Sequence, residues 1–283
     1  MTDHLAELTR RVPPPVDPVD AAGDWSAVEA ALSVSLPADY RALVERYGWG
    51  AFADFLSVHT PFGNRAHSRV EWQGTPQFVP AGADAAREYP YPLHPSPGGL
   101  LIWGSDEDAN RLGWLTDGPA DTWSVVIWGR GGGYEEHPMG AARFLDRWVT
   151  GTLESALLPA NDTGLAPWFE PARTRRQVCV RLDEGELPYV ERLRILREAL
   201  TPTADRGAEV GADDRRRDHF AATARDWLVT YEAMYDHRIR VSFPPDDDEW
   251  VRRDILAAVD LMGCRVVSTR LANGTPVWAT AAR

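Results

Sequence analysis

Histidine, cysteine and serine are the residues of this sequence that could act as nucleophiles, bases or metal ligands. The seven histidines show no HxH or HExxH spacing, and neither of the two cysteines lies at ligand spacing from a histidine, so the pattern predicts no metal site. Ser57 with His59, or Cys179 with a histidine, could form a nucleophile and its base after folding. No nucleophile-elbow glycines flank them, and Cys179 alternates with Val178 and Val180 in a predicted strand, which favours an inert buried thiol. The sequence therefore predicts neither a catalytic set nor a metal site.

Two further clusters have simpler structural interpretations. Gly129 and Gly131–Gly133 follow a predicted strand, as a phosphate-binding loop would, but Arg130 interrupts them and Glu135 and Glu136 would repel a phosphate. A hairpin turn is favoured. The acidic run 246–249 could bind a divalent metal, yet it lies where a helix begins, and carboxylates stabilise that end of a helix dipole. We favour the helix start.

Charge is divided unevenly along the 283 residues. All 30 basic residues are arginine, which excludes lysine Schiff-base chemistry and a phosphate-loop lysine. Residues 1–170 contain 11 Arg against 23 Asp and Glu, whereas residues 171–283 contain 19 of each, so the whole net charge of -12 lies in the first part. That part should repel nucleic acid and attract a cationic partner. An acidic surface that only maintains solubility explains the same charge.

Composition indicates a cytoplasmic protein of about two domains. No apolar run reaches the roughly 20 residues that span a bilayer, the N-terminus lacks a secretory signal, and two cysteines fit a reducing compartment, so no membrane association is expected. Nine of the twelve tryptophans precede residue 170. They could form an aromatic core or an exposed partner surface.

The first domain is predicted to be α+β over residues 24–158, after a proline-rich lead-in at 1–23. Helices are expected after Asp24, between Pro37 and Gly48, around 82–88, and within 139–153. Strands are expected at 51–62 and as an antiparallel meander at 100–105, 111–117 and 123–130.

A linker is predicted at 159–175, followed by a smaller α+β domain at 176–283. Its expected elements are a strand at 177–182, a helix at 187–200, a polar loop at 203–218, a hairpin formed by 227–233 and 238–244, a helix at 247–262 and a strand at 264–271; 219–224 could be helix or strand. The order suggests a ferredoxin-like layout with one added strand.

Several short motifs in the first domain occur in a characteristic order. Leu36–Tyr40 reads LPADY, Tyr47–Gly50 reads YGWG, and Phe52–Leu56 reads FADFL; LIWG, GWL, DTWSVV and RFL follow between 101 and 145. Over roughly residues 25–155 the chain resembles the SUKH superfamily. The resemblance implies helices around a twisted antiparallel sheet, no cofactor, and binding to other proteins. Many bacterial members are immunity proteins against toxins, often nucleases, and fungal members regulate cell-wall synthesis.

We therefore expect a non-enzymatic protein that neutralises a cationic toxin domain by covering it, without binding nucleic acid. The loop 105–110 is more acidic than the usual form of the family, and residues 176–283 resemble no family that we recognise. A regulatory scaffold acting through the C-terminal domain, or a hydrolase using a histidine from 59–97, are the alternatives. The candidate partner-binding residues are carboxylates expected on turns of the meander: Asp106, Glu107, Asp108, Asp117, Asp121, Glu135 and Glu136.

Overall fold

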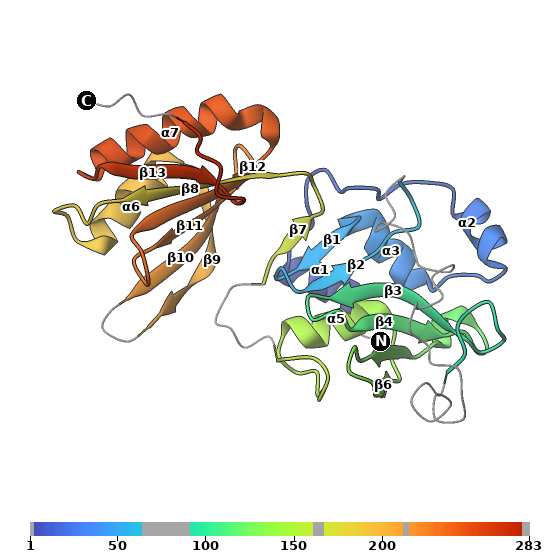
Figure 1. Cartoon of the computed structure of the whole chain (residues 1–283). Coiled ribbons are helices and arrows are strands. Elements are labelled where there is room, and N and C mark those ends of the chain that lie inside the picture. The colour runs from blue at the N-terminus through green and yellow to red at the C-terminus, as the bar shows by residue number, and fades with distance from the viewer. Residues whose placement is uncertain (1–2, 64–90, 161–166, 212–214, 279–283) are drawn as a thin grey trace. The chain divides into compact units, whose positions relative to one another are not determined.

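The computed structural model describes residues 3–63, 91–160, 167–211 and 215–278. The chain divides into two compact units, one formed by the described residues up to 160 together with Pro167–Ala172, the other beginning at Arg173. The described residues contain six α-helices and two antiparallel sheets (Figure 1). The expected two-part α+β class is confirmed.

The N-terminal unit is built on a seven-stranded sheet in the order β6-β5-β4-β3-β2-β1-β7. The meander is confirmed as β3, β4 and β5, whereas the single strand expected at 51–62 is two short strands joined by a turn with left-handed backbone at Ala53 and Asp54. Strand β7 lies within the stretch predicted as a linker and pairs with β1. The strands are β1 (Gly50–Phe52), β2 (Leu56–Val58), β3 (Leu100–Asp106), β4 (Arg111–Leu115), β5 (Val125–Trp128), β6 (Tyr134–His137) and β7 (Phe169–Pro171).

Four described helices belong to this unit: α1 (His4–Arg11), α2 (Trp25–Leu32), α3 (Ala38–Tyr47) and α5 (Ala141–Val149). The predictions of α2, α3 and α5 are confirmed. Asp24 caps α2 by accepting a hydrogen bond from the amide of Ala27, and Gly48 ends α3 at φ +67°, where a Cβ atom would lie 2.2 Å from the carbonyl oxygen of Val19. The helix expected around 82–88 lies outside the described residues.

Helix α1 was not predicted, because only a proline-rich lead-in was expected before residue 24. Asp3 caps α1, and Leu5 and Leu8 are buried on its inner face. The helix contacts α5, where Arg11 and His4 both bond to the carboxylate of Asp146. The N-terminal segment is therefore part of the folded core.

Aromatic side chains fill the space between the sheet and α1, α3 and α5. Trp103 and Trp114 stack with ring centroids 5.4 Å apart, and Tyr40 meets Trp114 edge to face at 4.8 Å. The hydroxyl group of Tyr40 donates to the carbonyl oxygen of His59 at 2.6 Å. Trp123 and Trp128 are also buried, so all four tryptophans of the meander are core residues rather than a partner surface.

The C-terminal unit has a six-stranded sheet in the order β13-β8-β12-β11-β10-β9, with helices α6 and α7 packed against one face (Figure 1). Its strands β8, β11, β12 and β13 and both helices follow the β-α-β-β-α-β order of a ferredoxin-like unit, with two strands added where one was expected. The elements are β8 (Arg176–Leu182), α6 (Tyr189–Ala199), β9 (Thr203–Val210), β10 (Arg216–Ala222), β11 (Trp227–Glu232), β12 (Arg238–Phe243), α7 (Asp248–Leu261) and β13 (Val266–Leu271).

The added strands correct the prediction of a polar loop at 203–218. Strand β9 lies at the sheet edge and contains no fully buried side chain, so its sequence lacks the apolar alternation that marks an inner strand. It is held by backbone pairing with β10. Residues 219–222, which the sequence left open between helix and strand, belong to strand β10.

Candidate partner-binding surface

The hairpin turn between β3 and β4 carries three of the seven predicted carboxylates. Asp106 is buried, and its carboxylate accepts hydrogen bonds from the amide of Asn110 at 2.8 Å and from its side-chain nitrogen at 2.6 Å. Asn110 in turn accepts from the amide of Arg130, so Asp106 shapes this turn and links it to the next one. Glu107 and Asp108 are exposed at the tip and have no ion-pair partner among the described residues.

The connection between β4 and β5 holds two further candidates at the other end of these strands. Asp121 lies in a short 3-10 helix (Ala120–Thr122) and accepts a hydrogen bond from the amide of Ala38 at 2.7 Å, which caps the start of α3. Asp117 is exposed and has no ion-pair partner in the described part of the chain. A five-residue strand separates the two groups by roughly 17 Å, so the candidates do not converge on one site.

Glu135 and Glu136 lie on strand β6 rather than on the turn predicted for them. Glu135 faces the helices and accepts from the Ser155 hydroxyl and from the amides of Ala156 and Leu157. Burial acts to raise its pKa, but these hydrogen bonds outweigh burial and lower the pKa below its usual value. Glu136 points to the opposite face of the sheet, opposite Val126, and is exposed.

Another carboxylate, Asp39 of the LPADY motif, joins two helices. It lies in the first turn of α3 and accepts a hydrogen bond from the amide of Ala142 in the first turn of α5 at 3.0 Å. Burial raises its pKa above the ordinary value despite that hydrogen bond. The motif therefore fixes the relative position of α3 and α5.

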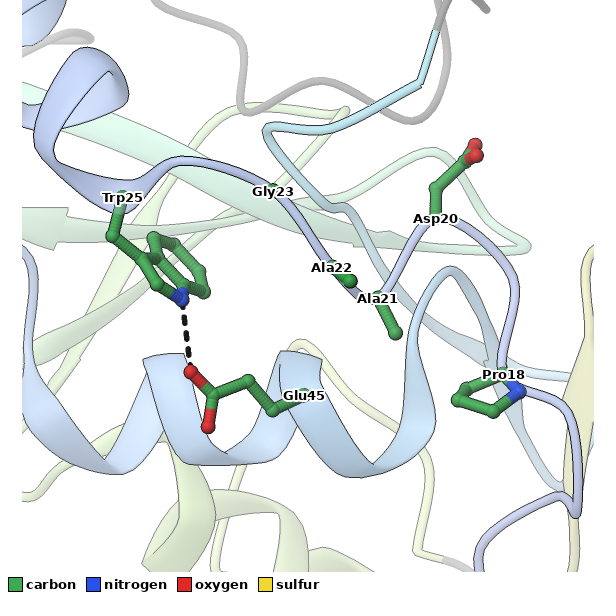
Figure 2. Close-up of a pocket in the computed structure, with 7 residues that line it drawn as sticks. All are labelled: Pro18, Asp20, Ala21, Ala22, Gly23, Trp25 and Glu45. Carbon is green, nitrogen blue, oxygen red and sulfur yellow. Dashed lines mark hydrogen bonds between the residues drawn. The ribbon is translucent and has the colours of Figure 1, made fainter.

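A hollow of about 630 Å³ beside α3 was not anticipated from the sequence. Figure 2 shows it between the segment 18–25 and α3, with the indole of Trp25 reaching across to Glu45. The Trp25 Nε1–H donates to Glu45 at 2.9 Å, and the ring packs edge to face on Phe62. Among the described residues, its lining includes the acidic residues Asp20 and Glu45 and no basic residue, and the carboxylate of Asp20 points away from the hollow. The lining residues are Pro18, Asp20, Ala21, Ala22, Gly23, Trp25 and Glu45. The one sequence signal near this hollow is Trp25, an aromatic residue directly after the helix-capping Asp24.

A smaller hollow of about 220 Å³ brings a histidine and a serine together. His59 Nε2 lies 3.3 Å from Ser105 Oγ, whereas the expected neighbour Ser57 is paired with Ser105 across β2 and β3. Ser105 is inside a strand whose backbone is paired on both sides, and Asp106 is occupied by Asn110. The amides next to Ser105 are thus engaged in the sheet and do not form an oxyanion hole.

The remaining chemical candidates have structural roles. Cys264 is buried, but Cys179 is only half-buried and lies on the face opposite Val178 and Val180, which corrects the prediction of a buried thiol. Desolvation still raises the pKa of both thiols, which disfavours a reactive thiolate. Asp247 and Asp248 accept hydrogen bonds from Trp227 and Trp278 at the start of α7, in line with the helix-start interpretation. Residues 129–133 form the hairpin loop between β5 and β6. Within the described residues, no group of three or more potential ligands could hold a metal ion, and no helix is long and apolar enough to cross a membrane.

Comparison with known proteins places one part of this chain in a family. Residues 22–145 match the SUKH_6 family model, which is described as SMI1-KNR4 cell-wall. The matched residues are rather less than half of the chain. Searches of the curated proteins and of the solved structures gave no significant match. The match includes the LPADY helix, the YGWG turn and the meander, whose arrangement is described above. The N-terminal unit thus contains a SUKH-superfamily segment, as the motifs of the sequence imply.

Proposed function

We propose that this protein is an immunity protein whose N-terminal unit binds a cationic toxin domain, such as a nuclease, and covers its active surface. A SUKH segment supports an immunity or regulatory role that depends on binding another protein. The net charge of -12 within residues 1–170 carries the finer proposal, because it favours a basic partner. The protein would act in the cytoplasm of the cell that makes it.

The exposed carboxylates supply long-range attraction in this proposal. Glu107, Asp108, Asp117 and Glu136 have no ion-pair partner among the described residues, so their charges are available to a partner. Carboxylates at the rim of an interface mainly raise the association rate. Asp106, Asp121 and Glu135 are occupied by intramolecular hydrogen bonds and would position the surface rather than contact the toxin.

The hollow of Figure 2 fits a basic side chain of that partner. Its wall combines the Trp25 indole with the Glu45 carboxylate, and guanidinium or ammonium groups bind to both kinds of surface. We expect it to act as a short-range contact once the partner has docked.

The test requires a toxin domain encoded beside this gene. Co-production of the two proteins should restore growth, and the purified proteins should form a complex. Reversal of Glu107, Asp108 and Glu136 to Arg should slow association about tenfold or more and flatten its salt dependence. Glu249→Arg, an exposed carboxylate of the C-terminal unit, is the control. Failure to protect growth would refute the immunity role. Unchanged association rates in the triple charge-reversal variant would refute charge steering but leave the immunity role intact.

A regulatory scaffold is the alternative that the same family supports. Its partner would be a protein of the same cell, and deletion of the gene would alter growth in the absence of any toxin. A hydrolase is supported only by the proximity of His59 and Ser105. Turnover of model esters that disappears in Ser105→Ala would favour it over both binding roles.

A further inference from the structure

One face of the C-terminal sheet carries an unusual concentration of arginine. Val178, Val180 and Leu182 of β8 point toward α6 and α7, so the alternate residues Cys179 and Arg181 lie on the opposite face. Residues paired directly across an antiparallel ladder share a face. The strand register therefore defines which side chains make up this second face, here called the arginine face.

The arginine face is arranged in two rows that cross the sheet. One row contains Arg270, Cys179, Arg240, Thr230 and His219. The next contains Ser268, Arg181, Arg238, Glu232, Arg217 and Glu209. Five guanidinium groups thus share this face with two carboxylates, and a third carboxylate, Asp236 in the turn between β11 and β12, pairs with Arg181 at 3.1 Å. The unit as a whole has equal numbers of arginines and acids.

Glu232 balances only part of this charge. Its side chain is fully buried, and its carboxylate accepts from Arg217 at 2.5 Å, from Arg238, and from Arg240 at 3.5 Å. Glu209 also pairs with Arg217 at 3.0 Å, so two carboxylates face these three guanidinium groups and one positive charge remains unbalanced. Because Glu232 fixes these guanidinium groups, they lose little conformational freedom when a ligand binds.

Two arginines of the first row, Arg240 and Arg270, are only weakly paired. Arg240 contacts Glu232 at 3.5 Å, the outer limit of a hydrogen bond. Arg270 is exposed, and its guanidinium donates to the carbonyl oxygen of Gly274. They lie on β12 and β13, which flank β8 on either side of Cys179, so their Cα atoms are roughly 10 Å apart. Two carboxylates of a partner at a similar spacing could contact both Arg240 and Arg270.

We propose that the arginine face binds an acidic segment of a protein partner, a function distinct from the toxin binding proposed for the N-terminal unit. Guanidinium groups form bidentate contacts with carboxylates.

Nucleic acid fits this face less well. The aromatic residues of β10, β11 and β12, namely Phe220, Trp227, Tyr231 and Phe243, lie on the helix-covered side, so none is available to stack on bases. Five arginines against Glu232, Glu209 and Asp236 leave a surplus of two charges, which is small beside the roughly 6–10 phosphate contacts of a strongly salt-dependent DNA-binding protein. Glu209 would also lie against the phosphates.

The test measures fluorescence anisotropy of two labelled probes of equal charge, an Asp- and Glu-rich peptide and a single-stranded oligonucleotide, with the full chain. The peptide should bind saturably and more tightly than the oligonucleotide. The double variant Arg240→Gln, Arg270→Gln should weaken peptide binding by about tenfold. The matched control Arg194→Gln, Arg253→Gln removes the same charge from α6 and α7 and should change it less than about twofold.

Equal losses in both double variants would overturn the proposal, as would tighter binding of the oligonucleotide or no saturable binding of the peptide. Circular dichroism checks that each variant is folded. Toxin protection by the N-terminal unit should be unaffected in Arg240→Gln, Arg270→Gln, so the two proposals can fail separately.

Discussion

Glu232→Gln should destabilise the C-terminal unit, because the buried carboxylate holds three arginines in place. Its side chain is 0% exposed, while those of Arg217, Arg238 and Arg240 are 18%, 26% and 34% exposed. Removing one partner of a fully buried pair costs about 3–5 kcal/mol, and an exposed pair contributes about 0–1 kcal/mol. The arginines are partly hydrated, so we expect an intermediate loss of about 2 kcal/mol.

For a unit of this size, that loss lowers the melting temperature by roughly 10 °C. Thermal unfolding followed by circular dichroism would show the shift in the transition of the C-terminal unit. Glu209→Gln is the matched control, since its side chain is 40% exposed and also bonds to Arg217. It should cost less than about 1 kcal/mol. Equal melting temperatures for the two variants would show that burial of Glu232 does not strengthen its contacts.

Three other changes test the local chemistry. Asp106→Ala removes both hydrogen bonds to Asn110 and should cost about 2–3 kcal/mol in urea unfolding; a loss below about 0.5 kcal/mol would contradict this role. Burial lowers the pKa of His237 in the folded protein, so folding is favoured while the imidazole is neutral and stability falls as pH drops below the unfolded pKa of 6.5. His237→Gln should flatten this loss of stability, and an unchanged pH profile in the variant would exclude His237 as its cause. Burial raises the pKa of Asp39, so ionisation should reduce stability as pH rises above 3.8; Asp39→Asn should remove that decrease in unfolding measured across acidic pH, whereas a decrease of the same size would refute it.

Elements whose sequence contains both periodicity and end signals could be predicted. Helix α3 has buried Tyr40, Leu43 and Val44 at helical spacing between Pro37 and Gly48. Strands β3 and β5 are almost continuously buried and rich in branched or aromatic residues, which mark inner strands. Both kinds of signal are local in the chain.

Elements stabilised by distant partners could not be predicted. Strand β6 reads YEEH and shows no apolar alternation, and it forms because its backbone pairs with β5. Strand β9 likewise depends on β10, and α1 depends on its contact with α5, more than a hundred residues later. Backbone pairing and helix docking leave little trace in the residue types of a polar segment.

The same reason limits the prediction of the binding surface. Acidic residues in turns are visible in the sequence, and the Asp106 and Asn110 pair could have been identified from its short spacing. Asp121 bonds to Ala38 and Glu135 to Ser155, and these contacts appear only after folding. Sequence therefore indicates which carboxylates are present, while tertiary structure decides which of them are available to a partner.

Strand β7 determines where a recombination breakpoint can fall without disrupting the N-terminal unit. Phe169 packs against Tyr47 and Phe52 with ring centroids 5.0 and 4.9 Å apart, and the strand completes the sheet beside β1. A fragment that stopped at the end of the family match would leave the β1 edge open and prone to aggregation. Recombination that replaces the C-terminal half should therefore preserve the first half only when the breakpoint falls after Pro171.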